Sequence, residues 1–304
     1  MNEKSFLFKK KLYQHTFGLC NRFHIPYTYL KIYYYDFIMK QLLPTLELAF
    51  YKTKSIKISH SSAADEEERN VWVMWWQGID NAPQIVKSNI RVMKRIFGSR
   101  LKVISQNNVF NYVEIDPLLR LKLKNGLIPP AQWSDIIRVA LLKKYGGLWI
   151  DSTVVVSENI LKLPGLFERS FVSICSNSNR TYNVSREDWT TWFIGGSSQN
   201  SLFTFLYNFF IEYFNSFNII LDYFLLDYAI RYFYNKDINL QIEINAQKRD
   251  WKPLYFYDNL YNTSKNVDLS IVNNVNYCVQ KVTYKVDKKR IRSDSLYSYI
   301  SNLD

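Results

Sequence analysis

The sequence predicts an α/β fold, in which short apolar strands alternate with amphipathic helices. Residues 71–105 are patterned as strand, loop, helix and strand, and residues 134–153 as helix, glycine stop and strand. The chain has 304 residues, 47% of them hydrophobic, which is enough for one domain with a large core and an extension. We place the extension at residues 1–69 and the domain at 70–304, divided into a nucleotide-binding half (70–160) and a mixed second half (161–304).

The first segment is basic and rich in aromatic residues. Residues 1–58 hold ten Lys and Arg against three acidic residues, a net charge of +7 out of +12 for the whole chain. Two interpretations of this helical extension stay open: it binds an anionic membrane surface, or it is a hairpin packed on the domain. It has no uncharged apolar run of about eighteen residues and no small-residue cleavage site, so neither a spanning helix nor a secretory signal is expected. The polar, acidic stretch Ser61–Asn70 marks the domain boundary.

The domain begins with a strand-like aromatic run, Val71–Trp76. Gln77-Gly78 follows as a turn, and Pro83 suits the first turn of a helix. Apolar residues then recur at helical spacing, Gly98 ends the helix, and Leu101–Ser105 has strand character. This strand, helix, strand rhythm is typical of a nucleotide-binding half.

The most informative segment is SDIIRVALLKKYGGLWIDST, residues 134–153. Ser134 is a good N-cap, and a glycine at 146 or 147 supplies the left-handed residue that ends a helix, so we expect a helix over Asp135–Lys144. Asp135 and Arg138 lie three residues apart on a face that is otherwise apolar. Because an isolated buried charge is costly, these two side chains must be paired with each other or bound to a ligand.

The apolar strand Leu148–Ile150 runs out at Asp151. Carboxylates at the ends of strands in open α/β sheets commonly hold a metal or a ligand, so Asp151 is where we expect the chemistry. The structural alternative is a buried Asp that caps a turn, with an ion pair on the preceding helix.

Two further groups of polar residues lie in the second half. Leu221–Tyr228 is expected to form an aromatic helix, on which Asp222 and Asp227 lie about 140° apart and so do not make an acid–base pair. Over residues 280–285, strand alternation places three residues on one face: Lys281, Thr283 and Lys285. That face is either a clamp for an anionic group or the solvated edge of a strand.

The run at 134–153 resembles the donor-binding signature of the bacterial capsular polysaccharide synthesis family, which is related to glycosyltransferases with a D-x-D-type motif, including mannosyltransferase-like enzymes and the large clostridial toxins. The resemblance covers about Val71 to Lys285. It implies the glycosyltransferase type A fold, a Rossmann-like mixed sheet. It also implies transfer of a hexose, with retention, from a nucleoside diphosphate sugar such as a UDP-sugar. The acceptor would be a glycan or lipid-linked glycan of a capsular or other cell-surface polysaccharide, so that 70–160 is a donor half and 161–304 an acceptor half.

The resemblance also implies roles for individual residues. Catalytic roles fall on Asp151, Arg138 and Asp222, while Asp227 is expected to be structural. Donor contacts are implied for Trp76, Gln77, Gly78, Asp135, Arg138, Gly147, Asp151, Thr153, Lys281, Thr283 and Lys285. A divalent metal, Mn²⁺ or Mg²⁺, would be held by Asp151. Thr153 stands where relatives with the full motif carry a second Asp, and a hydroxyl is a poorer ligand for a hard cation than a carboxylate.

Other functional classes fit the sequence less well. Basic and aromatic residues together can indicate nucleic-acid binding, but the charge is concentrated outside the domain and no recognised nucleic-acid motif is present. Three widely spaced cysteines favour a reduced, cytoplasmic setting and do not have the spacing of a zinc site. If residues 1–58 bind a membrane, the protein would be peripheral on its inner face. All three histidines precede the domain, so it offers no His-based mechanism. A noncatalytic sugar-nucleotide-binding or scaffold protein of capsule assembly remains the alternative to an enzyme, and donor turnover distinguishes the two.

Overall fold

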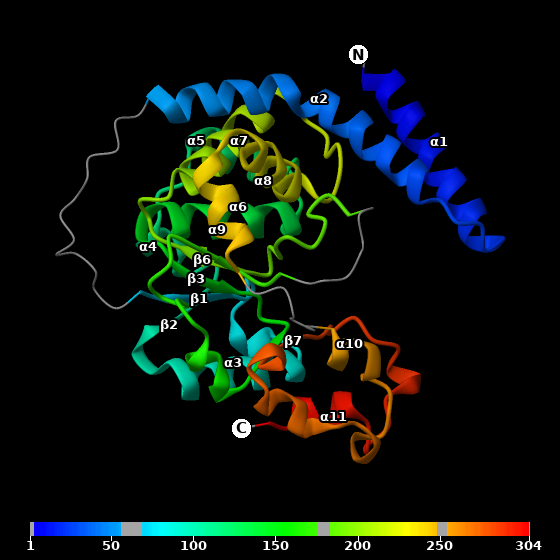
Figure 1. Cartoon of the computed structure of the whole chain (residues 1–304), viewed down its shortest axis with the longest axis vertical. Coiled ribbons are helices and arrows are strands. Elements are labelled where there is room, and N and C mark those ends of the chain that lie inside the picture. The colour runs from blue at the N-terminus through cyan, green and yellow to red at the C-terminus, as the bar shows by residue number, and fades with distance from the viewer. Residues whose placement is uncertain (1–2, 56–68, 176–182, 248–253, 304) are drawn as a thin grey trace.

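The structure, a computed structural model, describes residues 3–55, 69–175, 183–247 and 254–303 (Figure 1). Its centre is a five-stranded sheet in the order β2-β1-β3-β6-β5, in which β1 runs parallel to β2 and β3. β6 is antiparallel to β3 and β5, and two further strands, β4 and β7, form a separate antiparallel pair. The strands are β1 (Val71–Met74), β2 (Leu101–Ile104), β3 (Gly147–Ile150), β4 (Val154–Val156), β5 (Phe171–Ser173), β6 (Phe193–Gly196) and β7 (Val279–Lys281). The predicted α/β class is confirmed, and the sheet is mixed.

Side-chain alternation along the strands divides the interior into two cores. In β1, Val71 and Val73 pack into one cluster and Trp72 into the other. In β3, Trp149 lies in the cluster of Trp72, and Leu148 in that of the two valines. Successive side chains of a strand face opposite sides, so the sheet is buried on both faces, as strands in an α/β fold are.

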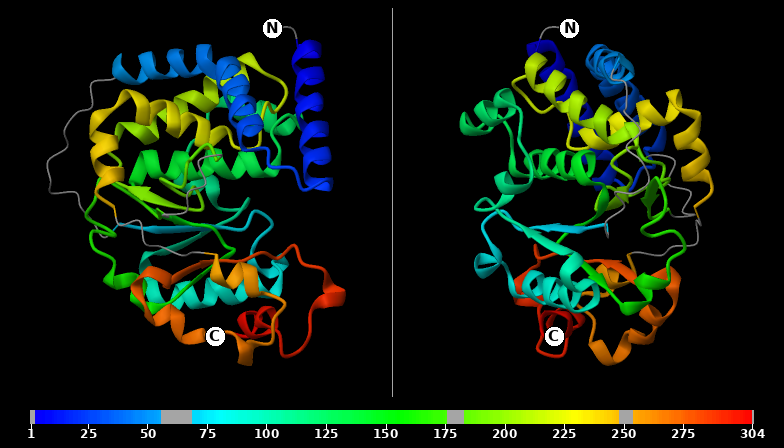
Figure 2. Two further views of the ribbon diagram at one scale, coloured as in Figure 1. Left: turned by 45° about the vertical axis from the view of Figure 1, so that its right-hand side comes forward. Right: turned by 90° about the vertical axis from the view of Figure 1, so that its left-hand side faces the viewer.

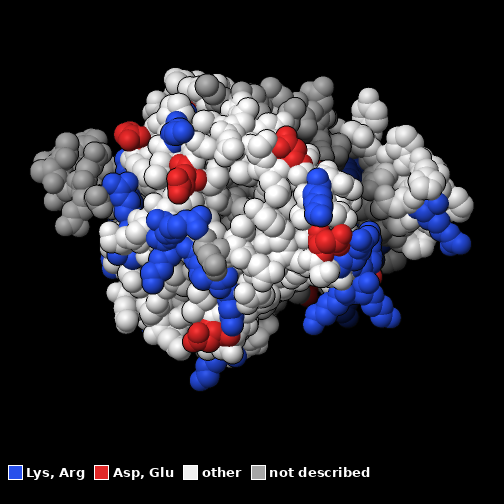
Figure 3. All heavy atoms as spheres, turned by 90° about the horizontal axis from the view of Figure 1, so that it is seen from below, with Lys and Arg blue, Asp and Glu red and all other residues white. Residues whose placement is uncertain are grey.

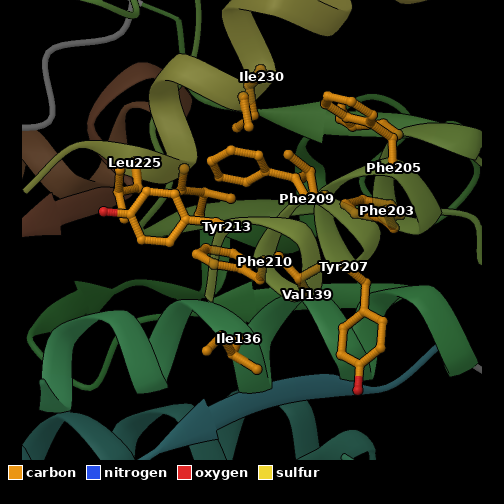
Figure 4. Packing of buried hydrophobic residues seen from close by; sticks show 14 of the residues in the cluster. Ile136, Val139, Phe203, Phe205, Tyr207, Phe209, Phe210, Tyr213, Leu225 and Ile230 are labelled. Carbon is orange, nitrogen blue, oxygen red and sulfur yellow. The ribbon is translucent and has the colours of Figure 1, made fainter. Parts of the chain in front are cut away.

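Helices cover both faces of this sheet (Figure 2). On the Trp72 side lie α2 (Thr28–Ser55), α5 (Pro117–Lys124), α6 (Pro130–Tyr145), α7 (Ser201–Ser216), α8 (Leu225–Lys236) and α9 (Ile238–Asn245). On the other side lie α3 (Gln84–Phe97), α10 (Tyr255–Asn259) and α11 (Leu296–Ser301), and the short α4 (Val109–Tyr112) follows β2. Ile136 and Val139 of α6 pack toward the aromatic residues of α7 (Figure 4).

Helix α6, which carries the predicted site, begins more than one turn earlier than expected. Pro130 lies in its first turn, where the fixed φ of proline suits a helix, so Ser134 is inside the helix and is not its N-cap. The predicted end is correct, because Gly146 is the C-cap with a φ of 64°. All residues from Ile136 to Leu142 are buried, which encloses Arg138 in the protein.

The first two helices, α1 (Glu3–Arg22) and α2, form a hairpin at the edge of the molecule (Figure 1). In α2, three residues are fully buried in the core that α7 and α8 share: Ile38, Leu42 and Leu46. α2 therefore packs on the domain, as expected if the extension is a packed hairpin. The predicted boundary at 61–70 lies almost wholly outside the described residues. In the described part of the chain, no helix is long and apolar enough to cross a membrane.

Candidate functional site

Several of the predicted site residues gather where the parallel strands β1 and β3 end. Asp151 directly follows β3, and its backbone N–H donates a hydrogen bond to the carbonyl of Trp192, just before β6 (2.9 Å). The chain then enters β4, which pairs with β7 so that Val154 lies opposite Lys281. This pairing brings Lys281 to Asp151, 130 positions away in the sequence.

Five side chains form a connected group that we call the Asp151 cluster: Asp135, Arg138, Trp149, Asp151 and Lys281. Oδ1 of Asp151 accepts hydrogen bonds from Nη2 of Arg138 at 3.1 Å and from the Trp149 indole at 2.8 Å. Oδ2 of Asp151 accepts one from Nζ of Lys281 at 2.8 Å. Arg138 also donates to Asp135 at 2.7 Å, and its guanidinium lies 4.9 Å from the centre of the Trp149 ring. The buried acid and base of α6 are therefore paired, as the sequence predicted.

Burial and charge act in opposite directions on the two carboxyls of the cluster. Burial raises the pKa of Asp135 to about 6, although Arg138 opposes the shift. Burial also acts to raise the pKa of Asp151, but Lys281 and Arg138 together outweigh it and hold that pKa below its usual range. Asp151 is thus ionised at neutral pH and lies between two cations. The pKa of Asp135 is about 6, and when Asp135 is protonated the two cations of the cluster outnumber its one remaining carboxylate.

The Asp151 cluster opens into a cavity of about 340 Å³. Besides Asp135, Arg138, Asp151 and Lys281, the cavity is lined by Ala131, Ser134, Thr191, Trp192, Tyr223, Phe224, Leu226 and Asp227. Nε of Arg138 is buried and has no hydrogen-bond partner among the described residues. An unsatisfied buried donor costs about 1–3 kcal/mol. Arg138 and Lys281 line the cavity and offer two cations to a phosphate or diphosphate group.

The residues as arranged do not fit the divalent metal that the resemblance implies. Both oxygens of Asp151 face cations, and Nζ of Lys281 also lies 2.8 Å from the Thr153 hydroxyl, between the two positions that a D-x-D motif would use. A hard cation needs several oxygen ligands, and the described residues contain no group of three His, Cys, Asp or Glu side chains placed to hold one.

The structure places Asp222 outside the Asp151 cluster and does not support the catalytic role predicted for it. Its Oδ2 accepts a hydrogen bond from the Tyr34 hydroxyl at 2.7 Å and its Oδ1 one from the backbone N–H of Phe224 at 2.9 Å. Helix α8 begins only at Leu225, so the helical spacing assumed for this segment is absent. Asp222 is buried, does not line the cavity, and instead ties the N-terminal hairpin to the start of α8.

Asp227, expected to be structural, lines the cavity instead. Its carboxylate accepts a hydrogen bond from the Trp189 indole at 2.9 Å. Burial raises the pKa of Asp227 to about 7; the indole opposes the shift and the nearby Asp135 adds to it. This is a carboxyl that changes its protonation state near neutral pH.

Asp227 also lines a second cavity of about 250 Å³ that adjoins the first. The two cavities share Thr191, Trp192, Phe224 and Asp227. The second one adds mostly aromatic and polar residues, among them Tyr35, Glu187, Trp189 and Thr190. Asp227 therefore stands at the junction of the cavity that Arg138 and Lys281 line and the aromatic one.

Other predicted donor residues lie outside the Asp151 cluster. Trp76 follows β1 and packs edge to face on Trp133 of α6, with ring centres 5.8 Å apart; it does not line the cavity, and neither do Gln77 and Gly78. Gln77 is exposed and Gly78 has a φ of 85°. All three nevertheless follow the parallel strand next to β3, on the same edge of the sheet.

Gly147, Thr283 and Lys285 are placed differently from the predictions. Gly147 begins β3, at the opposite end from Asp151, and a Cβ there would lie 2.2 Å from the carbonyl oxygen of Asn70. Gly147 therefore lies away from the predicted donor site. Its lack of a side chain allows the backbone of β3 to pack closely on the backbone of Asn70. Strand β7 ends at Lys281, so Thr283 and Lys285 do not share a strand face with it, and Lys285 is exposed.

Sequence reasoning missed three residues of the site: Trp149, Trp192 and Asp227. Strand periodicity could have found Trp149, since residues two apart on a strand face the same side and Trp149 precedes Asp151 by two. For Trp192 no local pattern indicated that it would line both cavities, because its position depends on the antiparallel pairing of β6 with β3.

Comparison with known proteins bears on the family. No solved structure matches the chain. The O-glycosyltransferase PaGT of Phomopsis amygdali is 26% identical over 105 residues, and the glycosyltransferase afumC of Aspergillus fumigatus is 28% identical over 102 residues. These matches cover 31% and 30% of this chain and 26% of each fungal protein, so the chain spans about a quarter of the length of these relatives.

The family described as capsular polysaccharide synthesis protein matches residues 30–300. The match begins within α2 and includes the central sheet, the Asp151 cluster and β7. It therefore extends beyond the 71–285 region in which the sequence pattern was recognised. The chain belongs to the capsular polysaccharide synthesis protein family.

Proposed function

We propose that this protein is a glycosyltransferase of the type A fold that moves a hexose from a nucleoside diphosphate sugar, a UDP-sugar, to a capsular or other cell-surface polysaccharide or its lipid-linked precursor. The observation that carries the proposal is the Asp151 cluster, where a buried Arg138 and Lys281 face a cavity at the carboxyl edge of parallel strands. The family and the names of the two fungal relatives support the same reaction class. We place the reaction on the cytosolic face of the membrane.

The transfer reaction requires charge stabilisation at two places. The bond between the anomeric carbon and the diphosphate oxygen breaks, and its electron pair leaves with the nucleoside diphosphate. The acceptor oxygen bonds to the anomeric carbon and its hydroxyl loses a proton. Arg138 and Lys281 stabilise the negative charge that grows on the diphosphate, while the carboxylate of Asp151 orients both cations and faces the positive charge on the sugar ring.

In this proposal, Lys281 and Arg138 form a cation clamp that replaces the divalent metal. Lys281 bonds to both Asp151 and Thr153, the two positions of the D-x-D-like motif. Thr153 suits a lysine partner at this position, because an ammonium group needs fewer carboxylates than a metal ion. The clamp predicts donor binding in the presence of EDTA.

The aromatic cavity is proposed as the acceptor site, with Asp227 at its junction with the donor. Tryptophan and tyrosine rings suit the apolar faces of a sugar ring, and Trp189, Trp192 and Tyr35 line this cavity. A carboxyl whose pKa is raised to about 7 suits the removal of a proton from an acceptor hydroxyl. Such a base favours inversion, whereas the family resemblance implies retention. The anomeric configuration of the product, read by NMR, distinguishes the two.

The proposal is tested by incubating the purified chain with a panel of UDP-, GDP- and CDP-sugars and measuring release of the nucleoside diphosphate. We expect one donor to be consumed by the wild type and Asp151→Asn to lower the rate by about a hundredfold or more. Asp36→Asn, which removes an exposed carboxylate of α2, is the matched control and should leave the rate unchanged. Turnover of no donor, together with tight nucleotide binding, would favour the noncatalytic scaffold role.

A further inference from the structure

The outward face of α1 has a composition that the proposed reaction does not explain. We propose that this face docks the protein on an anionic lipid surface, with its apolar side chains among the acyl chains and its cations at the headgroups. The inference is independent of the reaction, because no residue of α1 lines either cavity.

The inward face of α1 is what attaches the helix to the protein. Phe6 is buried and stacks on Phe37 of α2 with ring centres 5.3 Å apart. Phe17 meets Tyr34 edge to face at 5.5 Å, and Nζ of Lys10 donates a hydrogen bond to the carbonyl of Ile220 at 3.2 Å. These contacts hold α1 on α2 without using the opposite side of the helix.

The outward face is an apolar stripe. At about 100° per residue, Phe8, Leu12 and Leu19 fall within about 40° of one another on α1. Their side chains are 70%, 58% and 41% exposed. Phe23 and Ile25, in the loop that joins α1 to α2, are also largely exposed. Figure 1 shows α1 at the outside of the molecule, beside α2. An exposed apolar row of this kind indicates an interaction surface.

Positive charge flanks the stripe on both sides. Around the helix axis, Arg22 and Lys11 lie about 40–60° from the edge of the stripe on one side. On the other side, Lys9 lies about 80° from the middle of the stripe. All three side chains are exposed. α1 contains five Lys and Arg against one acidic residue, Glu3, which lies on the far side of the helix from the stripe. This combination distinguishes a lipid surface from a second copy of the chain, because two such faces would repel each other. Amphipathic helices with cations beside an apolar face lie in the plane of a membrane interface.

The test is sedimentation of the full chain with vesicles of phosphatidylcholine alone and of phosphatidylcholine with phosphatidylglycerol. We expect binding to the second kind only. The triple variant Phe8→Gln, Leu12→Gln, Leu19→Gln should bind at least about a hundredfold more weakly, because it removes three apolar side chains from the interface. Lys9→Gln with Lys11→Gln should weaken binding by about tenfold or more. These side chains point outward, so the thermal unfolding midpoint should not change.

The matched control removes two exposed cations elsewhere. Lys288 and Lys289 are exposed and lie in a 3₁₀ turn (Lys288–Arg290) near the C-terminus. Figure 3 shows that Lys and Arg form several separate groups on the lower face of the molecule. Lys288→Gln with Lys289→Gln should leave vesicle binding unchanged. The proposal is overturned if the intact chain does not bind anionic vesicles, if the triple variant binds as well as wild type, or if the control pair weakens binding as much as the α1 pair. It is also overturned if ultracentrifugation shows a dimer that the triple variant dissociates, since a second copy would then cover the stripe.

Discussion

Asp151 lies directly after β3, and both of its carboxylate oxygens are hydrogen-bonded. The motif predicted a carboxylate at the end of a strand, and the structure places it there, with three hydrogen-bond donors on its two oxygens. Two of those donors are cations, so the carboxylate fixes the position of two positive charges. The sequence could predict Asp135, Arg138 and Asp151 as a group because they are close along the chain. The approach of Lys281 depends on β4 pairing with β7, which local patterns do not specify.

The role of Lys281 gives a prediction at the residue scale. Lys281→Gln removes the ammonium group that lies 2.8 Å from Asp151, so UDP should bind about tenfold to a hundredfold more weakly, the range expected for a charge-assisted hydrogen bond. Lys285→Gln, four residues on and exposed, should bind UDP as the wild type does. Isothermal titration measures both, and equal effects of the two changes would mean that only net charge matters.

Asp227 gives a prediction about pH. Its pKa is about 7 in the folded chain against an ordinary value of 3.8, so the folded state holds the proton more tightly than the unfolded state. The resulting stabilisation is present in full below about pH 4 and is lost as pH rises through 7. Asp227→Asn, which keeps an acceptor for the Trp189 indole, should therefore be more stable than wild type at pH 8, by up to about 4 kcal/mol, and equal to it near pH 4.

Urea unfolding at both pH values measures this difference. Asp135, whose pKa is raised to about 6, contributes with the same sign and remains in the variant, so only part of the pH dependence should disappear. If Asp227→Asn destabilised the chain equally at both pH values, the buried, titrating carboxyl inferred here would be wrong.

At the scale of elements, the two adjacent glycines where α6 ends and β3 begins allow a backbone conformation and a close packing that other residues would not. Gly146 ends α6 with a φ of 64°, and Gly147 has a φ of 92° beside the carbonyl of Asn70. The sequence predicted a glycine stop here, and the helix ends as expected. It could not reveal that the second glycine packs against the start of β1, because that contact forms only in the assembled sheet.

Gly147→Ala should therefore be strongly destabilising. A Cβ at 2.2 Å from a backbone oxygen cannot be relieved by a side-chain rotation, and φ is unfavourable as well, so we expect a loss of about 3 kcal/mol or more in the free energy of unfolding. Gly126→Ala is the matched control, because Gly126 has a φ of 70° but no atom within 4 Å of the added Cβ. It should cost about 1 kcal/mol. Equal losses in urea unfolding would show that only the φ angle matters.

Two predictions from the sequence were wrong about where a helix begins. Helix α6 starts at Pro130 and not after Ser134, because the fixed φ of proline suits the first turn of a helix. Residues 221–224 are not helical, since Asp222 accepts the backbone N–H of Phe224 and forms a turn before α8. In both places local hydrogen bonding or proline stereochemistry decided the boundary, and apolar periodicity alone did not show it.

At the scale of the whole molecule, the N-terminal helices and the sheet are parts of one packed structure. α2 supplies Ile38, Leu42, Leu46 and Ala49 to the core on one side of the sheet, and the family match begins within this helix. The basic, aromatic composition of residues 1–58 was visible in the sequence. Its division into an inner helix that packs and an outer helix with an exposed stripe required the three-dimensional arrangement.

The packing of α2 predicts the effect of two neighbouring leucine substitutions. Leu42 is fully buried, so Leu42→Ala should lower the free energy of unfolding by about 2–5 kcal/mol. Leu43 is 39% exposed, and Leu43→Ala should cost much less, below about 1 kcal/mol. Urea unfolding of both variants checks this, and a small loss for Leu42→Ala would indicate that the hairpin is not part of the cooperative core.

The central claim, that the Asp151 cluster binds a nucleoside diphosphate through a cation clamp, is tested most directly by isothermal titration with UDP, GDP and CDP, in EDTA and again with Mn²⁺. A cation clamp predicts that UDP binds in EDTA, that Mn²⁺ does not strengthen binding, and that Lys281→Gln weakens it. Binding that requires Mn²⁺ would contradict the clamp, and no binding of any nucleotide under either condition would contradict the site itself.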